Sequence, residues 1–166
     1  MKKKHTVYFG FALMTLIGLQ SCKTTEEVIG EEPVNTLASV YTLTIKEVSS
    51  GYLTGYGAEG IEEGGVVINS QEEWDALTTK MNSVNKSIKE QPIDFDRGTV
   101  LAYFDQIRGS GGYTVEIESA TKTGKKIQGQ IKKASPKGDA IEIMTQPFHI
   151  VIIQKSNDKV SFTDSI

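Results

Sequence analysis

The chain has 166 residues, which is enough for one domain with a hydrophobic core, and its composition of 38% hydrophobic and 23% charged residues is ordinary for a globular protein. Its formal charge of −3 argues against nonspecific nucleic-acid binding, which depends on basic residues. With one cysteine and two histidines, no disulfide can form within the chain and no Cys/His zinc cluster is possible. We expect neither a metal site nor a cofactor.

Residues 1–21 have the features of a signal peptide. A positively charged start precedes a mostly apolar run from 7 to 19, which is too short to span a bilayer as a stable helix. The run ends in Leu19-Gln20-Ser21-Cys22, which resembles a lipobox. This resemblance implies cleavage after Ser21 and acylation of Cys22, so that the acyl chains hold the protein on the membrane. The alternative is a plain secretory signal that happens to end near a cysteine.

Residues 22–38 follow as a predicted flexible tether, because they are rich in glutamate and show no hydrophobic periodicity. Gln20-Ser21 before the cysteine and acidic residues soon after it resemble lipoproteins of the Bacteroidetes. The resemblance implies a place on the bacterial outer membrane, facing either the periplasm or the cell surface. Lipid attachment also removes the only thiol, which excludes thiol catalysis.

From 39 to 166 the sequence predicts a single α+β domain, with a mostly antiparallel sheet and one helix. Residues 40–48 alternate between apolar and polar, which predicts one half-buried strand. A glycine-rich loop and a short strand over 66–68 follow. A helix is expected over about 70–83, because Ser70 and Glu73 form a capping-box pattern ahead of the apolar stripe Trp74, Leu77 and Met81.

The remaining residues predict a β-meander. Residues 99–107 are nearly continuous in apolar side chains, as expected for a central strand covered on both faces. Gly109, Gly111 and Gly112 permit a tight reversal into an alternating strand that begins at Tyr113. Further turns are expected around Gly124 and Gly138, with a last short strand near 160–163.

Two apparent motifs carry little specific chemistry. Gly55-Tyr56-Gly57-Ala58-Glu59-Gly60 matches a dinucleotide-binding fingerprint, but no helical pattern and no βαβ unit follow, so we interpret it as a loop. His149 lies in an apolar strand, and a catalytic role would require a nucleophile or a metal beside it. We therefore favour a hydrogen-bonded structural histidine or an edge residue.

Two other features are candidates for binding. The first is the segment 109–113, in which glycines precede a tyrosine, a composition that suits a recognition loop. The candidate binding residues are Gly109, Ser110, Gly111, Gly112 and Tyr113, together with His149. The alternative is a plain glycine hairpin. Six lysines fall in one predicted hairpin, at positions 122, 125, 126, 132, 133 and 137. They form either a solvated outer face or a docking patch for an acidic partner or for phosphate-bearing headgroups.

The order of these features resembles the PrcB-type protease-complex subunit family. The likeness runs from about Glu59 to Lys155 and rests on the Trp74 helix, the Gly111-Gly112-Tyr113 segment and the strand Gln146-Pro147-Phe148-His149. It implies a non-catalytic accessory or binding module on the bacterial envelope.

We therefore expect a lipid-anchored envelope protein, not an enzyme, that binds a protease or another envelope protein as an accessory subunit. Its contact with the membrane would be through the acyl chains on Cys22. Two alternatives remain. One is a protease inhibitor that uses the Gly109–Tyr113 loop, and the other is a hydrolase that relies on His149.

Overall fold

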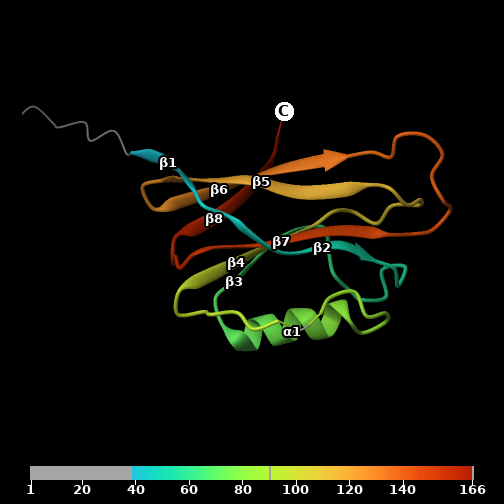
Figure 1. Ribbon diagram of the computed structural model, residues 1–166, viewed down its shortest axis with the longest axis horizontal. Coiled ribbons are helices and arrows are strands. Elements are labelled where there is room, and N and C mark those ends of the chain that lie inside the picture. The colour runs from blue at the N-terminus through green and yellow to red at the C-terminus, as the bar shows by residue number, and fades with distance from the viewer. Residues whose placement is uncertain (1–38, 90, 166) are drawn as a thin grey trace, which may run out of the picture. The chain divides into compact units, whose positions relative to one another are not determined.

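Two four-stranded sheets contain the strands of the part of the chain that the computed structural model describes, residues 39–89 and 91–165 (Figure 1). In the first, called the β5 sheet, the order is β1 (Val40–Leu43), β5 (Thr114–Thr123), β6 (Lys126–Ala134) and β8 (Lys159–Asp164). In the second, called the β7 sheet, the order is β2 (Lys46–Leu53), β7 (Gln146–Gln154), β4 (Gly98–Phe104) and β3 (Gly64–Ile68). The predicted signal peptide, Cys22 and the tether lie outside the described residues.

The helix α1 (Gln71–Met81) covers the outer face of the β7 sheet, and the β5 sheet covers the other face (Figure 1). Strand pairing is antiparallel except between β6 and β8, which run parallel. The predicted α+β class, with a mostly antiparallel sheet and a single helix, is confirmed for the described residues.

Strand β4 is buried on both faces, as its continuous apolar sequence predicts. Val100, Ala102 and Phe104 pack in the core beneath the helix, whereas Leu101 and Tyr103 pack in the core between the two sheets. Successive side chains of a strand point to opposite faces, so only a strand with no polar alternation fits this central position.

The helix begins where its capping pattern predicts. The Ser70 hydroxyl oxygen accepts a hydrogen bond from the backbone N–H of Glu73 at 3.2 Å, and the Glu73 carboxylate accepts one from the backbone N–H of Asn69 at 2.7 Å. Trp74, Leu77 and Met81 are buried against the β7 sheet. The helix–sheet contact is therefore the one that the apolar stripe specifies.

Two predictions about strand connections are wrong. The single strand expected over 40–48 is divided, because β1 pairs with β5 and β2 pairs with β7 in the other sheet. The chain changes sheets near Ile45 while Leu43 and Ile45 both stay in the inter-sheet core, so the alternation continues across the break. The expected meander is a sandwich instead, since β4 and β5 follow one another in sequence but belong to different sheets.

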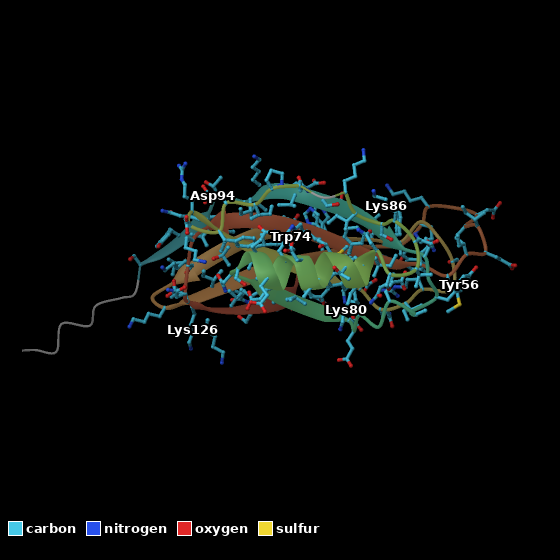
Figure 2. The ribbon with its side chains drawn as sticks, turned by 90° about the horizontal axis from the view of Figure 1, so that it is seen from below. Tyr56, Trp74, Lys80, Lys86, Asp94 and Lys126 are labelled. Atoms are coloured by element: carbon cyan, nitrogen blue, oxygen red, sulfur yellow. The ribbon has the colours of Figure 1, made fainter. Side chains whose placement is uncertain are left out.

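Different connections between strands lie at the two ends of the sandwich. The turn end holds the start of β1, the β5–β6 turn and the connection from β7 to β8. The loop end holds the three connections 54–63, 105–113 and 135–145. Figure 2 shows Tyr56 at the loop end, and Asp94 and Lys126 at the other end.

Candidate functional site

The predicted binding loop joins the two sheets rather than forming a hairpin between neighbouring strands. Arg108 and Thr145 form an isolated antiparallel bridge, with N–O distances of 2.7 and 3.0 Å. The N–H of Gly111 donates to the carbonyl of Ile141 at 3.0 Å. The loop 105–113 is therefore held against the loop 135–145 by backbone hydrogen bonds, and the glycines serve this packing.

An ion pair between a buried carboxylate and a partly exposed arginine fixes the start of the same loop. Asp105 is fully buried, and its Oδ2 accepts from Arg108 Nε at 2.8 Å and lies 2.7 Å from Arg108 Nη2. The guanidinium also covers the ring of Tyr113, at 4.7 Å from its centroid. Tyr113 is thus half-buried beneath Arg108, which does not favour its use as a free anchor in a protease inhibitor.

Lys133 of β6 completes this charged cluster. Its Nζ lies 3.4 Å from Asp105 Oδ1, an ion pair without a directed hydrogen bond, and 3.1 Å from Glu63 Oε1. Burial by itself lowers the pKa of Lys133, but the hydrogen bond to Glu63 and the nearby Tyr103 and Asp105 outweigh it, so the pKa is raised. The cluster ties β6 to the connections before β3 and after β4.

Exposed apolar side chains lie on all three connections of the loop end, namely Tyr56, Ile107, Ile141 and Met144. Ile141 is 77% exposed and Tyr56 is 66% exposed. The connections touch one another, since a Cβ placed at Gly57 would lie 2.6 Å from Ile107 Cδ1 and one at Gly111 would lie 3.6 Å from Ile141 Cγ1. The loop end is therefore a braced surface that leaves apolar area in water.

A second feature, called here the β2–β5 cleft, opens beside the loop end and has a volume of about 400 Å³. Its lining comes from three strands, as Glu47, Ser50, Gly51 and Tyr52 of β2, Thr114, Val115 and Glu116 of β5, and Phe148 and His149 of β7. None of residues 109–113 belongs to the lining. The predicted residues thus lie in two places, with His149 in the cleft and the Gly109–Tyr113 loop adjoining it through Thr114.

His149 connects the two sheets. Its Nδ1 accepts the backbone N–H of Ile117 at 2.8 Å, where the β5–β6 register shifts between Ile117 and Ser119. An acceptor nitrogen carries no proton, so this hydrogen bond assigns the proton of the neutral ring to Nε2. Nε2 lies 3.7 Å from Glu47 Oε2, beyond hydrogen-bonding distance. The prediction of a hydrogen-bonded structural histidine agrees with this geometry.

The cleft lacks the arrangement that nucleophilic catalysis by a serine needs. Ser50 lies opposite His149 in the sheet, but its Oγ donates to Glu47 Oε1 at 2.8 Å. A general base must present an unprotonated nitrogen to the hydroxyl, and the only such nitrogen of His149 is occupied by Ile117. His149 is therefore not placed to act as a general base toward Ser50.

The lysines of the predicted basic hairpin are divided between the two ends of β6. Lys122, Lys125 and Lys126 lie at the turn end, where Lys122 pairs with Asp158. Lys132 pairs with Glu118, and Lys133 belongs to the Asp105 cluster. A single patch of six free charges is therefore not formed.

Sequence reasoning assigned no functional role to Glu47, Glu116 or the Asp105–Arg108 pair. One signal for the pair was available, since an aspartate stands directly after a fully apolar run and an arginine follows three residues later. The two glutamates gave no signal, because alternating glutamates are common on the outer face of strands.

The described ranges 39–89 and 91–165 contain no group of three His, Cys, Asp or Glu side chains placed to hold a metal ion. Within the same ranges, no helix has the length and hydropathy needed to cross a membrane.

Comparison of the chain with protein-family models, with curated proteins and with solved structures gives no match in any of the three. The resemblance to PrcB-type subunits stays a prediction.

Proposed function

We propose that this protein is a lipid-anchored envelope protein whose β-rich domain binds another protein without catalysing a reaction. The observation that carries the proposal is the loop end, where exposed apolar side chains stand on connections fixed by backbone bonds and by the Asp105–Arg108 pair. Binding through a surface that is already ordered loses little conformational entropy, which favours recognition by such a surface.

The backbone of Tyr56 supports a binding role for the loop end. Its φ is 55°, a conformation that is uncommon for residues other than glycine, and its side chain remains exposed. The turn is closed by a hydrogen bond from the N–H of Ala58 to the carbonyl of Gly55 at 2.9 Å. Strained residues with exposed side chains are typical of binding sites, because folding alone does not benefit from them.

The position of the first strand also suits this role. β1 begins at Val40, which pairs with Thr123 beside the β5–β6 turn. The nine residues of β6 separate this turn from the loop end, a distance of about 30 Å in an extended strand. A tether that leads to an acylated Cys22 would therefore join the domain at the end away from the proposed binding surface.

The proposed partner is a protein of the same envelope, and the PrcB-type resemblance favours a protease or its precursor. Affinity purification from detergent-solubilised envelopes at native expression tests this. We expect one stoichiometric partner with the unmodified protein and its loss from the double variant Ile107→Ser, Ile141→Ser. Val40→Ser removes an exposed apolar side chain at the turn end and should retain the partner. Recovery of no stoichiometric partner, or equal recovery with the double variant, would refute the proposal.

The membrane anchor is tested separately. Cells that produce the unmodified chain should incorporate labelled palmitate into it and hold it in the membrane fraction. Cys22→Ala should abolish incorporation, because the acceptor thiol is absent. Labelling of the Cys22→Ala chain at the same level would contradict lipid attachment at this residue.

A further inference from the structure

The geometry points to a second contact with the partner, in which an extended peptide segment carrying Lys or Arg lies in the β2–β5 cleft along the open part of β5. The inference rests on the proposed function, since the peptide is a segment of the bound protein. Beyond the proposed function, it specifies where on the domain this segment binds and that the segment is basic.

Half of one edge of β5 is open. β1 pairs only with residues from Ala120 to Thr123, and within 39–89 and 91–165 no strand pairs with β5 on that side before Ala120. The N–H of Ile117 faces this edge, because it donates to His149 in the cleft. In an antiparallel strand, alternate residues direct both backbone groups to the same edge, which places those of Val115 there too. An added strand would continue the line of β1.

The cleft also has a polar atom directed at a ligand. The side chain of His149 is only 7% exposed, and its Nε2–H has no hydrogen-bond partner among the described residues. Nε2 is not one of the buried unpartnered side-chain atoms, so this donor faces the open cleft, where it can bond an entering acceptor such as a peptide carbonyl.

The charge of the lining selects a basic segment. Glu47 and Glu116 line the cleft, and neither has a Lys or Arg partner in the described part of the chain. Lys132 lies opposite Glu116 in the strand register, but its Nζ turns to Glu118 at 3.3 Å. Two uncompensated carboxylates attract a cationic side chain and repel an acidic one. The glutamate-rich stretch 22–38 of this chain is thereby disfavoured as the occupant.

Binding of synthetic peptides to the detergent-solubilised full chain tests the inference. One pool of octapeptides has Lys fixed at the centre and Ser, Thr, Val or Tyr at the other positions, and the matched pool has Glu at the centre. We expect enrichment from the Lys pool alone, and new protection of Val115 in amide hydrogen exchange. Equal enrichment from both pools, no enrichment from either, or protection elsewhere would overturn the inference.

Matched variants locate the contact. Glu116→Gln should weaken binding of the selected peptide about fivefold, the size of a partly exposed ion pair, whereas Glu118→Gln on the same strand should not change it. Equal weakening by both would also overturn the inference. Because synthetic peptides replace the partner, failure here with an intact loop-end interaction would refute the cleft contact alone.

Discussion

His149 accepts the backbone N–H of Ile117 over 2.8 Å, and this side chain thereby joins β7 of one sheet to β5 of the other. The bond occurs where the bulge of β5 turns a backbone donor away from β6. It gives the histidine a structural role and fixes which of its nitrogens faces the cleft.

Removal of this acceptor should destabilise the domain. In His149→Ala the N–H of Ile117 loses its partner inside the protein, which costs about 1–3 kcal/mol of unfolding free energy, besides the cost of the cavity. His149→Asn places an amide oxygen near the position of Nδ1 and should recover part of the loss. Urea unfolding measures both. Equal stability of the Ala variant and the unmodified chain would contradict the structural role.

Replacement of Arg108 should destabilise the loop end. Arg108→Ala leaves the buried carboxylate of Asp105 with Lys133 alone and uncovers Tyr113, so we expect a loss on the order of 3 kcal/mol. Arg97→Ala is the control, because Arg97 is exposed and its side chain makes no ion pair with the described residues. If the midpoint of thermal unfolding shifts by the same small amount in both variants, the Asp105–Arg108 ion pair does not stabilise the loop end as described.

Gly65 marks the close approach of β3 to β8. A Cβ at this position would overlap ring carbons of Phe162, whose ring also packs 5.7 Å from that of Tyr103. Gly65→Ala should therefore cost about 1–3 kcal/mol through displacement of the Phe162 ring. Gly109→Ala is the matched control, since nothing lies within 4 Å of its Cβ position. Chemical denaturation that ranks Gly109→Ala as the more damaging change would refute this packing.

The ion pair of Lys122 and Asp158 predicts a dependence on acid. The hydrogen bond from Lys122 lowers the pKa of Asp158 below its ordinary 3.8, and the bond to Asp158 raises that of Lys122. A lowered carboxyl pKa contributes stability above pH 3.8 that is lost as the pH falls through the folded value. Lys122→Met should thus reduce the urea midpoint at about pH 6 but not at about pH 2. Lys137→Met, at an exposed position, is the control and should leave the urea midpoint unchanged at both pH values. A decrease of the midpoint in Lys122→Met that persists at the acidic pH would contradict the ion pair.

The sequence predicted those features that depend on one segment. Ser70 and Glu73 mark the start of the helix, and the apolar run of β4 predicts its place between two layers, because each signal is local. The division between β1 and β2 was missed, because alternation specifies which face is buried and not which strand is the partner.

The cleft depends on distant segments and could not be predicted in the same way. Glu47, Glu116 and His149 come from three strands of two sheets, and their proximity follows from the crossing near Ile45 and the bulge after Ile117. Likewise, the loop with Gly111 and Tyr113 was identified as a candidate, but the Arg108 contact that half-buries Tyr113 required the fold.

Photo-crosslinking in intact cells tests the central claim, that the loop end contacts a protein partner. A photoreactive amino acid replaces Ile141 in one strain and Val40 in another, both exposed positions at opposite ends of the sandwich. We predict one discrete adduct from position 141 upon irradiation and none from position 40. Absence of an adduct at 141, or the same adducts at both positions, would contradict the account.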